Sequence, residues 1–321
     1  MANKNIKETK KKETPERTSS NDINPRVDIA FQKIFGVEEN KDLLISLINS
    51  IVQPEDQVTT ITIKNPYNPR SFKLDKLSVL DIKAEGPDGK KFNIEMQVTD
   101  EANYDKRALY YWAKVYTQQI GKTNKYSQLQ KTIGIHFLYF LSIPESSKYH
   151  NTFVLKEDET GVKFFKQIEL HTIELSKFDN CESTTLTTLA EKIKNKLDLW
   201  AAFLTHHDLL VTENLPESLQ DPEIRKAVEV IEVMNFTTEE RALYESRIDW
   251  LRLEADALDK AEDRGRDEGI EKGRIEGKIE GKIEGEHNKA IQIAKKMLSK
   301  NKSIEEIIEL TELSKAEIEN L

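Results

Sequence analysis

The stretch L-D-I-K-A-E-G-P-D-G-K-K-F-N-I-E-M-Q-V, residues 80–98, decides the fold. Apolar and polar side chains alternate on both sides of its central G-P-D-G. Alternation with a period of two residues is typical of β-strands, because successive side chains point to opposite faces of a sheet. The stretch therefore predicts a β-hairpin whose second strand carries four polar residues on one face: Lys91, Asn93, Glu95 and Gln97.

The turn of this hairpin determines which residues face each other. The Pro-Asp pair suits the centre of a type I turn, and the glycine after it suits the left-handed position that completes a three-residue loop. Such a loop pairs Gly86 with Lys90. Counting back along both strands from this pair places Asp81 opposite Glu95.

Two carboxylates directly opposite each other on neighbouring strands repel, which destabilises the sheet. A cation between Asp81 and Glu95 would remove the repulsion, and Mg²⁺ prefers oxygen ligands of this kind. The alternative is a solvated hairpin face on which Lys83 and Lys91 reduce the repulsion. The spacing by itself leaves both interpretations open.

More of the chain resembles one known family. An acid on one strand followed by Glu-x-Lys on the next is typical of the PD-(D/E)XK nuclease superfamily. The variant I-E-M-Q at 94–97 resembles its Rpn family, the recombination-promoting nucleases or transposases. The resemblance covers about residues 28–178. It rests also on D-I-A-F-Q-K-I-F-G (28–36), R-A-L-Y-Y-W-A-K-V-Y-T-Q-Q (107–119), Y-S-Q-L (126–129) and I-E-L-S-K-F (173–178), the last being similar to a closing strand.

This resemblance implies an α/β fold with a restriction-endonuclease-like mixed sheet flanked by helices, to which the sequence adds a long C-terminal helical tail. It implies that Asp81, Glu95 and the backbone carbonyl of Met96 bind Mg²⁺ or another divalent cation. Gln97 stands where the superfamily has lysine, so it can orient a water molecule but carries no charge. Asp28 is the implied acid of the first helix.

The implied activity is that of a metal-dependent DNA endonuclease, which hydrolyses phosphodiester bonds and is linked to recombination or mobile elements. The alternative is a catalytically inactive DNA-binding or oligomeric scaffold protein that keeps the nuclease fold. Both interpretations make DNA a partner of the chain. They differ in whether the carboxylates serve catalysis.

The charge distribution agrees with a DNA partner. Residues 61–135 hold 13 Lys and Arg against 8 Asp and Glu, although the whole chain has a net charge of −9. A basic surface of this kind would bind phosphates. The expected DNA-binding residues are Lys83 of the hairpin and one face of the helix expected at 103–120, namely Arg107, Tyr111, Lys114 and Gln118. The alternative is a helix that packs through its tyrosines and leaves a solvated rim.

The rest of the first 212 residues predicts further elements. Residues 1–24 are lysine-rich and typical of a disordered basic tail, and residues 25–212 form the nuclease-like domain. In that domain we expect helices at about 25–52, interrupted near Gly36, and at 184–205. We also expect strands at 57–64 and 153–178, and a central strand at 131–141 with His136 as a core residue. A single cysteine and the lack of a signal peptide predict a cytoplasmic location, and no apolar run is long enough to span a membrane.

The C-terminal part divides into a helical region (213–260), a glycine repeat (261–288) and a short helix-turn-helix-like tail (289–321). Thr237, Ser303 and Ser314 each precede a glutamate by three residues, which predicts capping boxes at helix starts. Six glycines recur at every fourth position from Gly265 to Gly285, and each costs about 1 kcal/mol in a helix relative to alanine. A partner helix would offset this cost, because residues four apart form the ridges of helix pairs. We therefore expect a homo-oligomer; the alternative is a flexible charged linker.

Overall fold

The computed structural model describes residues 23–65, 82–100, 103–121, 125–179, 185–211 and 215–321. The tail expected at 1–24 lies almost entirely outside these residues, and Asp81 lies outside them as well. The chain divides into two compact units, Met1–Leu251 and Arg252–Leu321. Among the residues described, no helix combines the length and the apolarity needed to cross a membrane.

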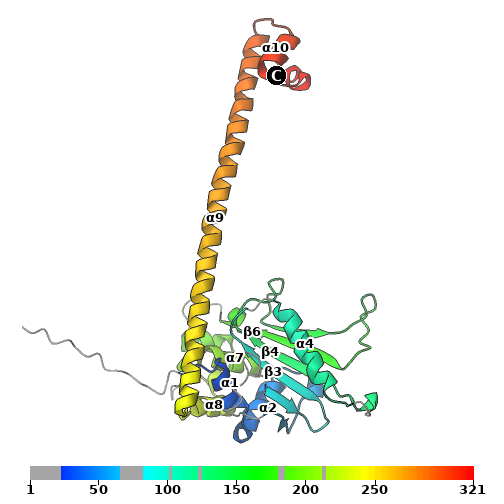
Figure 1. Ribbon diagram of the computed structural model, residues 1–321, viewed down its shortest axis with the longest axis vertical. Helices are drawn as coiled ribbons and strands as arrows, with labels where there is room; N and C mark the ends of the chain where they lie inside the picture. The colour runs from blue at the N-terminus through cyan, green and yellow to red at the C-terminus, as the bar shows by residue number, and fades with distance from the viewer. Residues whose placement is uncertain (1–22, 66–81, 101–102, 122–124, 180–184, 212–214) are drawn as a thin grey trace, which may run out of the picture. The chain divides into compact units, whose positions relative to one another are not determined.

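A six-stranded mixed sheet forms the centre of the first unit (Figure 1). The strand order is β1-β2-β3-β4-β6-β5, and only β3, β4 and β6 run parallel to one another. All residues of β4 are buried, which confirms the expected central strand. The bounds are β1 Thr62–Ile63, β2 Ile82–Glu85, β3 Lys91–Gln97, β4 Thr132–Leu138, β5 His150–Val154 and β6 Ile168–Glu174.

Helices flank the sheet, so the expected fold class is confirmed (Figure 1). The apolar side chains of β3 and β4 share the main core with the helices of one face, and its largest buried side chains include Trp200, Phe31 and Phe137. The helix α4 (Tyr104–Thr117) packs on the other face of β3 and β4. The other α-helices described wholly within this unit are α1 Asp28–Phe35, α2 Lys41–Asn49, α5 Leu175–Phe178, α6 Leu186–Lys192, α7 Lys196–His206 and α8 Pro222–Glu232.

The hairpin between β2 and β3 has the expected register. The amide of Gly86 donates to the carbonyl of Lys90 at 3.0 Å, and the amide of Gly89 donates to the carbonyl of Gly86 at 3.0 Å. Gly89 has the left-handed φ of 83° that the turn requires. The described pairing ends at Ile82 opposite Ile94, one residue before Asp81.

The polar face of β3 is buried, so the alternative of a solvated hairpin face is wrong. Asn93 is 1% exposed and Glu95 is 7% exposed. The lysine expected to reduce repulsion there, Lys91, forms an ion pair with Glu85 of β2 at 2.6 Å instead. Burial of these polar groups follows from the position of β3 inside the sheet and beneath α4.

The interruption expected near Gly36 is confirmed, because α1 ends at Phe35 and a 3₁₀ turn at Glu38–Asn40 precedes α2. Three expected elements differ in extent. The strand expected at 57–64 is reduced to β1. The helix expected at 184–205 is divided into α6 and α7, because Asn195 accepts from the amide of Asp198 in a capping box that starts a new helix. The expected closing strand ends at Glu174, where α5 begins.

The glycine repeat is helical, since it lies within the 61 residues of α9, Thr238–Leu298. The expected capping box starts this helix: Glu240 accepts from the amide of Thr237 and donates its own amide to the Thr237 hydroxyl. Ion pairs one turn apart, such as Arg274 with Glu271, connect charges along the repeat. In the second unit the end of α9 packs with α10 (Ile304–Thr311) and α11 (Lys315–Glu319), and both expected capping boxes are present there.

A chain of polar side chains crosses β5 and β6 at one edge of the sheet. Nε2 of His150 lies 2.9 Å from Nδ1 of His171, and Nε2 of His171 lies 2.8 Å from Oε1 of Glu169. Lys131 joins Glu169 to Asp56. Burial and the charge of His171 lower the pKa of His150 to about 4. Burial would raise the pKa of Glu169, but hydrogen bonds from His171 and Lys131 outweigh it and lower this pKa to about 2.

We expect this chain to make folding acid-sensitive. Below pH 6.5 His150 is protonated in the unfolded state, whereas in the folded state it stays neutral until about pH 4. The free energy of unfolding therefore decreases as the pH falls from 6.5 to 4. Glu169 adds a loss as pH falls from 4.5 towards 2. His150→Asn should lessen the loss between pH 6.5 and 4 by roughly 2 kcal/mol, after allowance for partial exposure. Urea unfolding at a series of pH values measures it; an unchanged pH dependence would contradict the assignment.

Candidate functional site

Glu95 occupies the middle of the buried polar face of β3. Its partner in the parallel ladder between β3 and β4 is His136. Both side chains lie on the face that α4 covers, and His136 is only 1% exposed. The pairing follows from the register of the two strands, because directly paired residues of neighbouring strands project to the same face.

A tyrosine of α4 completes a three-residue cluster with this pair. The hydroxyl of Tyr104 lies 3.3 Å from Glu95 Oε2 and 2.8 Å from His136 Nδ1. His136 Nδ1 itself lies 3.1 Å from Glu95 Oε2. The Tyr104 ring stands edge-on to the His136 ring, with centroids 5.9 Å apart. The carboxylate of Glu95 is therefore held by a hydroxyl and an imidazole, which offset part of the cost of burying it.

Gln97, two residues further along β3, is joined to α4 as well. Its Oε1 accepts a hydrogen bond from Arg107 Nη2 at 2.7 Å, and its Nε2 donates to the carbonyl of Thr99 at 3.1 Å. These contacts fix which end of the amide faces the guanidinium. The guanidinium of Arg107 also lies over the ring of Tyr104, at 5.2 Å from its centroid. Gln97 is uncharged, but its neighbour Arg107 brings a positive charge to this end of β3.

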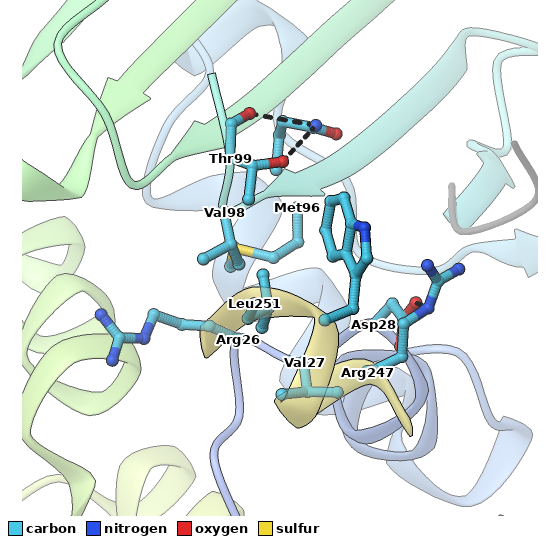
Figure 2. Close-up of a pocket in the computed structure, with 10 residues that line it drawn as sticks. Arg26, Val27, Asp28, Met96, Val98, Thr99, Arg247 and Leu251 are labelled. Carbon is cyan, nitrogen blue, oxygen red and sulfur yellow. Dashed lines mark hydrogen bonds and ion pairs between the residues drawn. The ribbon is translucent and has the colours of Figure 1, made fainter. Parts of the chain in front are cut away.

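A pocket of about 60 Å³ opens beside the end of β3 (Figure 2). Its lining comes from the start of α1, from residues 96–99 and from the first turns of α9. Figure 2 shows Arg26 and Arg247 on opposite sides of it, with Met96 and Leu251 between them. Trp250 of α9, 37% exposed, also lines it. The first unit thus includes the beginning of α9, which forms one wall of the pocket.

Asp28 lines the same pocket as Gln97 and Met96. Its carboxylate forms an ion pair with Arg247 Nε at 2.7 Å and accepts from the amide of Ile29 at 2.6 Å. Burial raises the pKa of Asp28, and Arg247 opposes that rise through its charge. The structure therefore brings the expected first-helix acid to the end of β3, with a cation already against it.

The expected DNA-binding residues divide into two groups. Arg107 is half-buried against Gln97, whereas Lys114 and Gln118 are exposed further along α4. Tyr111 is half-buried, with its ring edge-on to Tyr110. Lys83 is half-buried on β2, opposite Asn93 of β3.

The donor chemistry of the described residues fits the divalent cation that the resemblance implies. Within the described ranges no group of three or more His, Cys, Asp or Glu residues is arranged to hold a metal, and Asp81 lies outside those ranges. Glu95 and Gln97 of β3, and Asp28 in the pocket beside Gln97, nevertheless offer oxygen atoms, which hard cations prefer. The buried amide of Asn93, on the same face as Glu95, finds no hydrogen-bond partner among the described residues. The face thus has polar atoms that a hydrated cation could satisfy.

Sequence reasoning missed four contributors to this site. His136 was expected to be a core residue and is one, but it also contacts Glu95. The strand register would have indicated this contact if the pairing of β3 with β4 had been known. The sequence pattern around Tyr104, in the first turn of α4, did not indicate a contact with Glu95. Arg247 and Trp250 stand more than 200 residues from α1 in the sequence, and nothing in their neighbourhood indicates the pocket.

The sequence also matches a protein-family model. The model is described as PD-(D/E)XK nuclease family transposase, and it matches residues 25–261. That range includes the whole sheet, α4 and the part of α9 that lines the pocket. The match confirms the expected resemblance. No curated protein matches the chain. No solved structure matches it either.

The Asp28–Arg247 ion pair should contribute to folding. Arg247→Gln leaves a buried carboxylate without its cation, so we expect a loss of roughly 1–3 kcal/mol in the free energy of unfolding at pH 7. The loss should shrink at lower pH, where protonated Asp28 no longer buries a charge. In Asp28→Asn the loss should be smaller, and the double variant should lose less than the sum. Urea unfolding of all four proteins is the measurement; strictly additive losses would show that the pair does not interact.

Proposed function

The chain belongs to the PD-(D/E)XK nuclease family transposases, and we propose that it is a metal-dependent DNA endonuclease linked to recombination or mobile elements. The observation that carries the proposal is the burial of Glu95 on β3, two residues before Gln97, which lines a pocket together with Asp28. A nuclease or transposase-related function follows from family membership. Metal dependence and endonuclease activity are the proposed refinements.

In this proposal Glu95, Asp81 and the backbone carbonyl of Met96 hold a divalent cation such as Mg²⁺. When bound there, the cation would supply Lewis-acid chemistry, which would polarise a phosphate and make water easier to deprotonate. Gln97 orients the attacking water through its amide, whose direction is set by Arg107 and Thr99. Asp28 is proposed as an accessory acid. Its ion pair with Arg247 makes it a weaker candidate for a cation ligand than Glu95, because a cation there would compete with the guanidinium.

Arg107 supplies the positive charge that Gln97 lacks. A lysine at the Gln97 position would offset charge that develops on the phosphate, and an amide cannot. Since Arg107 Nη2 lies 2.7 Å from Gln97 Oε1, a phosphate that approaches Gln97 would also lie next to the guanidinium. Arginine also suits phosphate geometry, because its planar group donates several hydrogen bonds at once.

The DNA backbone would lie along the exposed side of α4. Lys114 and Gln118 are exposed there, and Arg107 and Tyr111 share their stripe by helical spacing. Lys83 on β2 extends this polar surface across the sheet. Such contacts position DNA without reading its sequence, so we expect binding to weaken steeply with salt.

The proposal predicts Mg²⁺-dependent nicking of supercoiled plasmid DNA. Glu95→Ala and Asp81→Ala should each abolish it, with a loss larger than the roughly 10–100-fold that removal of an outer-shell partner causes. Gln97→Ala should reduce the rate as well, because the water loses its orienting amide. The measurement is the rate of conversion from supercoiled to open-circular plasmid, with and without Mg²⁺.

Glu85→Gln is the matched control for these variants. Glu85 lies on the neighbouring strand and pairs with Lys64 and Lys91, away from the end of β3. It should retain the wild-type rate. Equal nicking by Glu95→Ala and wild type would contradict the assignment. DNA binding without cleavage by the wild-type protein would support the alternative of an inactive binding or scaffold protein.

We also propose that the chain forms a homo-oligomer through α9. Three isoleucines spaced by four residues are about half exposed in the second unit: Ile275 at 48%, Ile279 at 54% and Ile283 at 62%. A Cβ atom built on any of the six repeat glycines would have no described neighbour within 4 Å. A helix from a second copy could cover the isoleucines, while basic and acidic rows of the two copies face each other.

Replacing Ile275, Ile279 and Ile283 together by glutamine should weaken the oligomer by tenfold or more in Kd. Burial of one aliphatic side chain contributes roughly 1.5–3 kcal/mol, so three losses are ample for this effect. Analytical ultracentrifugation over a concentration series measures it. A control triple replaces three exposed apolar residues of the first unit by glutamine: Leu155, Val162 and Phe164. Identical association of wild type and the isoleucine variant would contradict the proposed interface.

A further inference from the structure

We infer that Tyr104 and His136 are positioning residues that orient the Glu95 carboxylate for the divalent cation. This inference rests on the proposed function. It goes beyond the metal ligands themselves, because it assigns a role to two side chains that touch neither cation nor DNA in the proposal.

Both groups approach the same oxygen. The Tyr104 hydroxyl lies 3.3 Å from Glu95 Oε2, and His136 Nδ1 lies 3.1 Å from it. Two donors on one oxygen fix the plane of the carboxylate. They thereby also fix the direction in which its second oxygen, Oε1, points. An orientation that is set before the cation binds lowers the entropy lost on binding.

The hydroxyl and the imidazole can both donate to Glu95 at these distances. An ionised carboxylate only accepts hydrogen bonds, so the contact with Glu95 is favourable when His136 carries its hydrogen on Nδ1. The Tyr104 oxygen, 2.8 Å from Nδ1, can then accept from the same hydrogen while its own hydroxyl donates to Glu95. The hydroxyl and the imidazole thus both support the same carboxylate oxygen.

The sheet reserves space for the imidazole in this position. Gly134 lies two residues before His136, on the same face of β4. A Cβ atom at Gly134 would lie 3.0 Å from His136 Nε2 and 2.6 Å from a methyl group of Leu170. Any larger residue would displace the imidazole or the leucine. The glycine is therefore part of the arrangement that sets the distance between His136 and Glu95.

Tyr104 is held as firmly as His136. It is 6% exposed and packs edge-on against Phe140, with ring centroids 5.6 Å apart. Asn103, immediately before it, has a left-handed φ of 63°, and its carbonyl accepts from the amide of Arg107 in the first turn of α4. The same helical turn thus delivers Tyr104 to Glu95 and Arg107 to Gln97.

The test is Mn²⁺ binding to the full-length protein, followed by electron paramagnetic resonance of the free ion. Tyr104→Phe and His136→Leu should each weaken the Kd by roughly 10–100-fold, the usual effect of losing an outer-shell partner. His136→Asn should recover most of the affinity, because its amide nitrogen can take the place of Nδ1–H. Plasmid nicking by His136→Leu should recover at saturating Mn²⁺, since the defect is in affinity.

Tyr149→Phe is the matched control. Tyr149 also donates its hydroxyl to a buried carboxylate, that of Asp198, but this pair belongs to the contact of the sheet with α7. It should lower the melting temperature without changing Mn²⁺ affinity. A purely structural role for Tyr104 and His136 would give the same result for their variants, and that outcome would overturn the inference.

Mn²⁺ binding distinguishes a failure of the inference from a failure of the proposed function. If Glu95→Gln abolishes Mn²⁺ binding while Tyr104→Phe and His136→Leu bind like wild type, the metal site stands and the positioning role is overturned. If the wild-type protein binds no Mn²⁺, or binds it as well as Glu95→Gln does, the proposed function is overturned together with the inference. Loss of affinity in both variants and its recovery in His136→Asn would support the inference.

Discussion

A carboxylate in the middle of a covered sheet must have hydrogen-bond partners, because an unsolvated charge costs several kcal/mol. Glu95 is such a carboxylate, so the elements of the first unit around it must supply its partners. It lies on β3, which has β2 and β4 on its two sides and α4 over its polar face. The groups that meet the requirement come from α4 and β4, so the positions of both elements relative to β3 are tied to one side chain.

The crossover from β3 through α4 to β4 explains how these groups meet. β3 and β4 are parallel neighbours, so the chain between them must cross one face of the sheet, and α4 does so. Consecutive elements of the chain therefore supply the carboxylate, the hydroxyl and the imidazole. Gln97 and Arg107 meet by the same crossover. One connection thus satisfies two polar side chains of β3 that would otherwise be costly to bury.

Much of this arrangement could be predicted from local sequence. The G-P-D-G turn determined the hairpin register because its glycine must adopt a positive φ, and the capping boxes at Thr237, Ser303 and Ser314 marked helix starts. Local patterns failed where two short-range preferences competed. In residues 184–205 the apolar spacing suggested one helix, but the cap at Asn195 divides it into α6 and α7.

The remaining features depend on pairs that are distant in sequence. Arg247 and Asp28 are an example, since neither has a local pattern that indicates the other. The burial of Asn93 and Glu95 is another, because strict alternation on β3 is equally typical of a strand with one solvated face. Only the placement of α4 decides between those cases. Family resemblance could identify Glu95 and Gln97, but it could not supply the residues that hold them.

Asp28 and Glu95 differ in a way that bears on their proposed roles. Asp28 has a guanidinium against it, and burial raises its pKa in spite of that charge. A divalent cation at Asp28 would have to displace Arg247 or share the carboxylate with it, and like charges close together are costly. The described contacts of Glu95 Oε2 come instead from the hydroxyl of Tyr104 and the imidazole of His136, which are supplied by α4 and β4. The Asp28–Arg247 pair has a separate task, because it joins α1 to α9.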